Sequence, residues 1–248
     1  MPDLSAIQWI LAAAVGLFLG FSKTGVAGAG ILVVPLMATI FPVKASVGIL
    51  LPMLIVGDFV AVAYYRRHAV WRHLVGLLPW VLVGMPLGYL ALKYSNNQQM
   101  KTALGFLVLG LVALQIVKGR CGNWMENKLP HTWWFVALAG LLSGFATTLA
   151  NAAGPIMSVY LLAKGLPKKE FVGTGAWYYL IVNLLKFPLY VSLGIITTDS
   201  LTFNAWMAPA ILLGAVLGIL VLPRIPQKLF EWIVILMTAI ASLRLILS

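Results

Sequence analysis

Runs of about twenty apolar residues follow one another along this chain, and they constrain the fold more than any motif does. A helix needs roughly 20 such residues to cross about 30 Å of hydrocarbon. Hydrophobic residues make up 62% of the 248 residues and charged residues only 9%, whereas about 25% of the residues in a soluble domain are charged. The sequence therefore predicts an all-α polytopic membrane protein, with single spans at 46–65, 71–92, 100–117, 171–193, 201–222 and 229–247.

Two further apolar runs, 6–41 and 132–163, are too long for a single crossing. As a straight helix with a rise of about 1.5 Å per residue, each would exceed roughly 45 Å. Small residues interrupt both runs near their middles, as TGVAGAG in the first and as LANAAGP in the second. Glycine and proline at this density destabilise a helix interior. Each run is therefore predicted to form two shorter helices joined by irregular backbone.

The two broken runs belong to a repeat with a spacing of about 125 residues, which predicts two homologous halves. Each half contains one broken element followed by three helices. The predicted limits are 1–118 for the first membrane repeat, 119–131 for a cytoplasmic linker and 132–248 for the second repeat. The matching positions are Gly20 with Gly144, Gly30 with Gly154, Gly48 with Gly173, Asp58 with Asn183, and, at an offset of 130, Pro79, Gly84 and Gly88 with Pro209, Gly214 and Gly218.

The distribution of lysine and arginine indicates how the halves are oriented, because cytoplasmic loops carry an excess of these residues. If each broken element crossed the membrane once, the two sides would hold seven and eight of them. If each turned back as a hairpin, the sides would hold eleven and four. The second count predicts hairpin-like elements and two repeats of inverted topology. It places the linker in the cytoplasm and both termini outside, in a protein of the cell (inner) membrane.

The breaks themselves predict an anion site. Irregular backbone at membrane depth is tolerated only where it is buried in protein or lines a polar cavity. Helices that restart after the breaks would direct free N–H groups and positive dipole ends towards the centre of the protein. Such helix ends favour bound anions. The predicted ligands are the backbone N–H groups of Gly28, Ala29 and Gly30 in the first half, and of Ala153 and Gly154 in the second.

Side chains near the breaks extend this predicted site. Thr24, Thr148 and Asn151 carry hydroxyl and amide groups that can bond an oxyanion. Lys23 and Lys186 lie within apolar runs, where ionisable residues mark functional sites by default. Either lysine could instead extend along its apolar stem to the membrane interface. We expect these five residues to surround the anion.

Asp58 lies near the centre of its apolar run and aligns with Asn183 of the other half. Its carboxylate would repel an anion unless it were neutralised. A proton on Asp58 would thus couple to anion movement, which is one interpretation of this residue. The other is a structural ion pair with one of the two lysines.

Other functions fit the sequence less well. Cys121 is the only cysteine, and the three histidines lie near the ends of apolar runs, so we expect no metal centre and no cofactor. No Ser/His/Asp cluster falls within the spans, which disfavours an enzyme. The net charge of +11 sits in short clusters between apolar runs, which indicates contact with anionic lipid rather than nucleic acid. The glycine pairs of the repeat, at small-xxx-small spacing, predict close helix packing.

Several stretches together resemble a known family: the glycine-rich break followed by ILVVPL, the stretch KASVGILLP, the repeat of both features, and NLLKFPLYVSLG. The chain resembles, over nearly its whole length, the TauE/SafE family of sulfite exporter and organosulfur-anion transporters. The resemblance implies transport of a small sulfur-containing anion such as sulfite or a sulfonate. We therefore expect a secondary transporter that works by alternating access around a midplane site. An anion channel, or a transporter for other small organic anions such as carboxylates, is the alternative.

Overall fold

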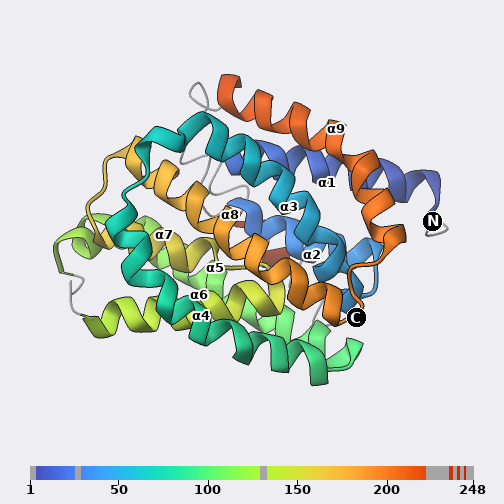
Figure 1. The fold of residues 1–248 in the computed structure, drawn as a ribbon, viewed down its shortest axis with the longest axis horizontal. Coiled ribbons are helices and arrows are strands. Elements are labelled where there is room, and N and C mark those ends of the chain that lie inside the picture. Colours follow the sequence, from blue (N-terminus) through green and yellow to red (C-terminus); the bar gives the residue numbers. More distant parts are fainter. Residues whose placement is uncertain are drawn as a thin grey trace.

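The computed structural model describes residues 4–25, 29–128 and 133–221, together with the helical residues 235, 236, 239, 240 and 243. Side chains are described except at 25, 29, 115, 118–128, 168 and 221. The described part of the chain is helical, with short connections and no strand. Its elements, in order, are α1 (Ala6–Gly25), η1 (Ala29–Leu32), α2 (Val33–Ile40), α3 (Val43–Tyr65), η2 (Arg66–His68), α4 (Trp71–Tyr94), α5 (Asn97–Lys128), α6 (Trp133–Ala150), α7 (Gly154–Ala163), α8 (Lys168–Ser192) and α9 (Thr198–Val221) (Figure 1).

The predicted spans coincide with described helices, which confirms an all-α polytopic membrane protein. The runs 46–65, 71–92, 100–117, 171–193 and 201–222 fall on α3, α4, α5, α8 and α9. Within the described residues, five helices are long and apolar enough to cross a membrane, namely α1, α3, α4, α6 and α9. The run 229–247 lies largely outside the described residues.

Both long apolar runs are broken where the sequence predicts. The first helix of each pair ends at the break, α1 at Gly25 and α6 at Ala150. Asn151 then adopts a left-handed backbone with φ of 54°, a conformation that asparagine tolerates better than most residues. Its N–H donates to the Thr147 carbonyl oxygen over 2.8 Å, which completes the last turn of α6. The chain resumes as α7 with a proline in its first turn, where the missing N–H has no cost.

Each broken element places its second, short helix against the same kinds of neighbour. In the first half, α2 packs against both α1 and α3, and in the second half α7 packs against α6 and α8. A segment folded back after its break would have these contacts. The hairpin topology, the inverted relation of the halves and the domain limits stay predictions.

Two helix pairs, α1 with α9 and α4 with α6, pack so closely that their backbones touch. A Cβ atom on Gly214 would overlap the Leu17 carbonyl oxygen, and one on Gly84 would overlap that of Leu141. Small residues permit such an approach in membrane helices. The packing role predicted for the paired glycines is confirmed, because Gly88 also meets Phe145 and Gly218 also meets Phe21. Glycines on the partner helices extend the same contacts: Gly20 of α1 meets Ile211, and Gly144 of α6 meets Val81.

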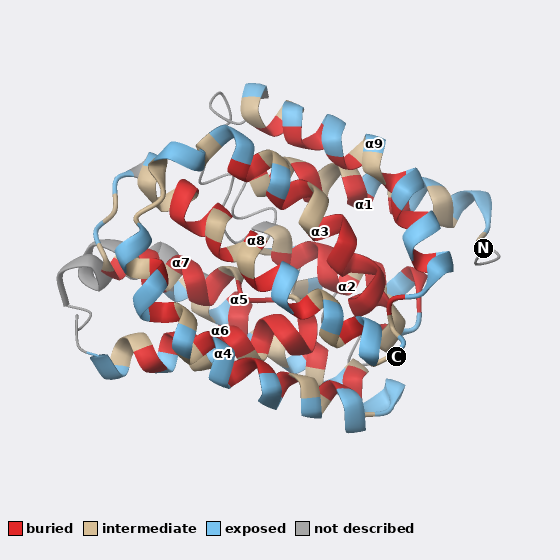
Figure 2. Cartoon of the chain, in the orientation of Figure 1, coloured by how far each residue is buried: buried red, intermediate tan, exposed pale blue. Residues whose placement is uncertain are grey.

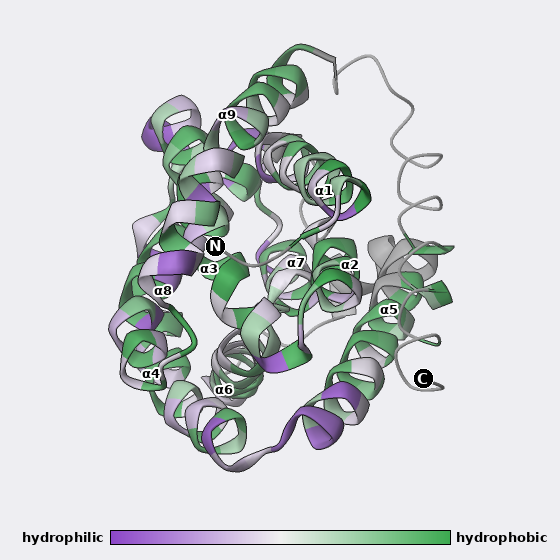
Figure 3. Ribbon diagram, turned by 90° about the vertical axis from the view of Figure 1, so that its right-hand side faces the viewer, coloured by the Kyte–Doolittle hydropathy of each residue, from purple (hydrophilic) through white to green (hydrophobic). Residues whose placement is uncertain are grey.

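In Figure 1, α3 and α8 lie between the α1–α9 pair and the α4–α6 pair, and they are called the central helices. Figure 2 shows many buried residues in the middle of the view, on α2, α3, α6 and α8, and exposed residues on the outward faces of α4 and α9. The outer helices α1, α5 and α9 carry mostly hydrophobic residues in Figure 3, as lipid contact requires. Polar residues of α3 and α8 are therefore held inside the protein, and they include Asp58, Asn183 and Lys186, each no more than 3% exposed.

Candidate functional site

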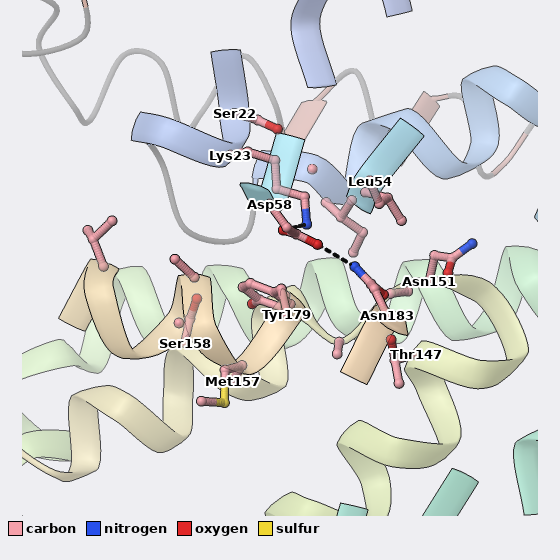
Figure 4. Close-up of a pocket in the computed structure, with 18 of the residues that line it drawn as sticks. Ser22, Lys23, Leu54, Asp58, Thr147, Asn151, Met157, Ser158, Tyr179 and Asn183 are labelled. Atoms are coloured by element: carbon pink, nitrogen blue, oxygen red, sulfur yellow. Dashed lines mark hydrogen bonds and ion pairs between the residues drawn. The ribbon is translucent and has the colours of Figure 1, made fainter. Parts of the chain in front are cut away.

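A cavity of about 70 Å³ lies between the two broken elements and the central helices α3 and α8. One water needs roughly 10–15 Å³ of such a volume, so the cavity has room for about five waters or for one small organic anion. Its lining follows one face of α8, at positions three to four residues apart. The residues that line it are Ser22, Lys23, Gly30, Ile31, Leu54, Asp58, Thr147, Asn151, Ala152, Ala153, Gly154, Met157, Ser158, Leu161, Phe171, Val172, Gly175, Ala176, Tyr179 and Asn183 (Figure 4).

Lys23 and Asp58 form an ion pair at one wall of the cavity. Lys23 Nζ lies 2.6 Å from Asp58 Oδ1, and the ammonium group also lies over the ring of Tyr179, 4.7 Å from its centroid. The second carboxylate oxygen, Asp58 Oδ2, accepts a hydrogen bond of 2.6 Å from Asn183 Nδ2. Both oxygens of this buried carboxylate are therefore engaged, one from each half of the chain. The structural ion pair considered for Asp58 is formed, and it involves Lys23.

Lys186 lies beside the cavity and is fully buried. Its Nζ donates to Asn151 Oδ1 over 2.6 Å, to Thr147 Oγ1 over 2.9 Å and to the Thr147 carbonyl oxygen over 3.0 Å. Three acceptors match the three N–H donors that only the charged ammonium carries. The side chain does not reach the membrane interface; it is held at the end of α6.

The two lysines differ in how their charge is balanced. Lys23 has a carboxylate partner, whereas the hydrogen-bond partners of Lys186 in the described part of the chain are all neutral oxygens. Asp58 is thus one negative charge against two positive charges among the described residues of this region. With all three groups in their charged forms, the region would carry one unit of positive charge beside a cavity large enough for an anion.

The backbone of both breaks reaches this cavity. Gly30 lines it from the first break, and Ala153 and Gly154 line it from the second. No side chain caps the start of α7, so its first N–H groups lack both an intrahelical partner and a side-chain cap. Ala29 begins η1, with its side chain outside the described part, and Gly28 lies outside the described residues altogether.

Of the predicted side-chain ligands, Lys23 and Asn151 line the cavity and Lys186 contacts its wall, but the two threonines face elsewhere. Thr24 Oγ1 donates to the Ala215 carbonyl oxygen of α9 over 2.9 Å. Thr148 packs where α6 meets Gly88 of α4, and its hydroxyl has no hydrogen-bond partner among the described residues. In this structure both threonines lie at helix–helix contacts.

Asn151 joins the break to both central helices. Its Oδ1 accepts from Lys186 of α8, and its Nδ2 donates to the Val47 carbonyl oxygen of α3 over 2.9 Å. The strained backbone at this position is therefore held by side-chain contacts on two sides. These contacts fix the start of α7 relative to the cavity.

Sequence reasoning did not select two residues that line the cavity, Ser158 and Tyr179. Tyr179 contacts Lys23 through its ring, a long-range contact with no local signal. Ser158 is the only hydroxyl-bearing aliphatic residue in the apolar segment GPIMSVYLLA, one turn after Gly154. A polar residue at that spacing from a predicted helix start is a signal that could have been used.

Comparison with known proteins agrees with this architecture. A model of the family "Sulfite exporter TauE/SafE" matches residues 12–245, which include both breaks and every residue that lines the cavity. No curated protein and no solved structure matches the chain. Helices able to span a membrane accompany the family match, so membrane transport is the function class that both support. The chain belongs to the sulfite exporter TauE/SafE family.

Proposed function

We propose that this protein is a secondary transporter of a small sulfur-containing anion, sulfite or a sulfonate, and that the anion binds in the cavity between the two broken elements. The observation that carries the proposal is the environment of Lys186. This lysine is fully buried, and its hydrogen-bond partners among the described residues are neutral. An isolated buried charge is costly, and an anion in the adjacent cavity would offset that cost.

The charge balance favours an anion that carries a single negative charge. Asp58 offsets Lys23 through their 2.6 Å contact, which leaves the charge of Lys186 for the substrate. The backbone N–H groups at the start of α7 lie at the same end of the cavity as Asn151 and add a positive helix end. Sulfonates and the monoanion of sulfite meet this requirement, and each has oxygens that can accept these donors.

A carrier needs a path from the cavity to one side of the membrane, and the start of α8 is the candidate. The lining extends along α8 to Phe171 and Val172, which are partly exposed residues near the start of that helix. Beyond the other end, the chain is tightly packed around Tyr190, which is fully buried and donates to the Thr148 carbonyl oxygen over 2.8 Å. A carrier that alternates between two states would expose its site to one side at a time.

The accessible end of the cavity lies near positive charge. Lys164 follows α7 there, and Arg72 is close enough that its charge, after burial, helps to lower the pKa of Lys164. Positive residues near a binding site raise the local concentration of anions. By the lysine and arginine distribution, we assign this end to the cytoplasm, both termini to the outside, and the protein to the cell (inner) membrane.

Asp58 gives the proposal a coupling mechanism. While the carboxylate is charged, it holds Lys23 and keeps negative charge beside the cavity. A proton on Asp58 would remove that charge and release Lys23 to face the anion. Transport of the anion would then be coupled to a proton through a single residue.

Counterflow of labelled sulfite or ethanesulfonate into liposomes that contain the purified chain tests the proposed function. Lys186→Gln keeps a polar side chain but removes the charge, and we expect roughly tenfold or greater loss of anion affinity, because the positive charge that would balance the anion is lost. Lys186→Arg retains the charge and should lose less. Lys93→Gln, at an exposed lysine near the end of α4, is the matched control.

The outcome also separates a carrier from the alternatives. Saturable counterflow with competition among sulfite and sulfonates supports the proposal. Large anion conductance without saturation would indicate a channel, and preference for lactate over the sulfur-containing anions would indicate a carboxylate transporter. A Lys186→Gln protein that binds and moves substrate like the parent would contradict the assigned site.

A further inference from the structure

Ser158 is a buried polar residue of the cavity whose hydroxyl is not used by the described part of the protein. It lies on α7, is 1% exposed and lines the cavity. Its Oγ has no hydrogen-bond partner among the described residues. Figure 4 places Ser158 beside Met157 and Tyr179, at the other end of the cavity from Asn151 and Thr147.

Other buried helical serines show what is unusual about Ser158. Ser22 donates to the Leu19 carbonyl oxygen over 2.8 Å, and Ser46 donates to that of Val43 over 2.7 Å. Serine in a helix commonly satisfies its hydroxyl in this way. A buried hydroxyl without a partner carries a desolvation cost, so each such group requires an explanation. For Ser158, the explanation is a hydrogen-bonding group of a ligand bound in the cavity that it lines.

The surroundings of Ser158 indicate what kind of ligand would carry a hydrogen-bonding group to it. The cavity wall around it includes the apolar side chains of Met157, Leu161, Phe171 and Ala176, together with Tyr179. Towards the other end, Asn151, Thr147 and the start of α7 offer donors and the charge of Lys186. The two ends are separated by about one turn of α7, roughly 5–6 Å. The cavity thus has an anion-binding end near Asn151, the Lys23–Asp58 pair on one wall, and the unpartnered hydroxyl of Ser158 at the far end.

This inference rests on the proposed function and narrows its substrate. We propose that the preferred substrate is a short organic sulfonate whose carbon chain bears a neutral hydrogen-bonding group, and that Ser158 is the residue that binds that group. Bare sulfite would occupy only the charged end. A second negative group on the chain would exceed the single positive charge that Lys186 leaves unbalanced, so the group at Ser158 is a hydroxyl or a carbonyl.

Two sulfonates that differ by one hydroxyl test the proposal, namely ethanesulfonate and 2-hydroxyethanesulfonate. Their dissociation constants would be measured by titration calorimetry on the full chain in detergent, with sulfite as a third ligand. The parent protein should bind the hydroxylated compound about three- to tenfold more tightly, as expected for one neutral hydrogen bond. Ser158→Ala should bring this ratio to about one while leaving the affinity for ethanesulfonate unchanged.

Ser46→Ala is the matched control, because Ser46 is also a buried helical serine but lies outside the cavity lining. It should keep the ratio of the parent. Equal binding of both sulfonates by the parent, or an unchanged ratio in Ser158→Ala, would overturn the role of Ser158. In either case, measurable binding of the sulfonates would still support the proposed function. Absence of binding for all three ligands, in a parent protein that is folded, would overturn both. Retained affinity for ethanesulfonate shows that the Ser158→Ala protein is folded.

Discussion

Removal of one charge from the Lys23–Asp58 pair should destabilise this protein strongly, because both groups are buried. The side chain of Lys23 is 12% exposed and that of Asp58 is 0% exposed, and their N···O distance is 2.6 Å. Asp58→Asn keeps the shape of the side chain and its ability to bond Asn183, but it leaves the ammonium of Lys23 without a counter-charge. Breaking a buried pair in this way costs about 3–5 kcal/mol. We expect a loss of that size in the free energy of unfolding.

Loss of both charges together should cost much less than the sum of the single losses. Lys23→Met alone leaves the Asp58 carboxylate buried beside Asn183, with a loss similar to that of Asp58→Asn. In the double variant neither charge remains, and buried pairs replaced by neutral residues are often as stable as the parent. A double-mutant cycle, which compares the parent, the two single variants and the double variant, should therefore give a coupling energy of about 3 kcal/mol or more between the two positions.

Reversible unfolding of the purified protein in mixed detergent micelles measures each corner of this cycle. Lys93→Met, at an exposed lysine, controls for the general effect of losing a positive charge. If Asp58→Asn costs less than about 1 kcal/mol, the usual value for a surface pair, the pair is not buried as described. Additive losses in the double variant would likewise refute the coupling between Lys23 and Asp58.

Three further predictions follow from the packing and the site. Gly214→Val should force α1 and α9 apart, because its Cβ would overlap the Leu17 carbonyl oxygen, and it should lower the thermal midpoint more than Gly76→Val, where no atom lies within 4 Å; equal midpoints would contradict the packing. If Asp58 takes up the coupled proton, Asp58→Asn should flatten the pH dependence of counterflow, and an unchanged pH profile would remove it from that role. Asn151→Gly keeps the left-handed backbone at φ 54° but loses the contact with Lys186, so it should weaken anion binding while losing less stability than Asn151→Ala, which also strains the backbone; binding equal to that of the parent would exclude Asn151 from the site.

The elements of the fold were predictable because their signals are local. Apolar length located the spans, and small residues together with glycine and proline located both breaks. The prolines at 42 and 167 also mark helix starts: each has an extended backbone, and α3 and α8 begin at the next residue. Because proline fixes its own φ and lacks an N–H, it suits such a boundary. The spans predicted at 46 and 171 therefore began three residues later than the helices do.

The side chains of the site were less predictable, because proximity in sequence does not determine the direction of a side chain. Successive residues of a helix point about 100° apart. Lys23 therefore faces the cavity while Thr24 contacts α9, and Thr147 lines the cavity while Thr148 packs against α4. The direction depends on how each helix is rotated against its neighbours, which is a tertiary property. Charge in an apolar run was the better guide, since Lys186 had to find polar partners wherever its helix placed it.

The hydrogen bond between Asp58 and Asn183 joins two positions that correspond in the repeat predicted from the sequence. In a symmetric dimer of two identical subunits, the residues at these two positions would be the same, so either two carboxylates or two amides would be in contact. Two carboxylates at that distance would repel each other. A single chain that contains both halves escapes this restriction, because each copy can change independently. If the two halves are repeats as predicted, their union in one chain permits a centre that holds one acid, one amide and lysines at non-equivalent positions, an arrangement unavailable to a symmetric dimer.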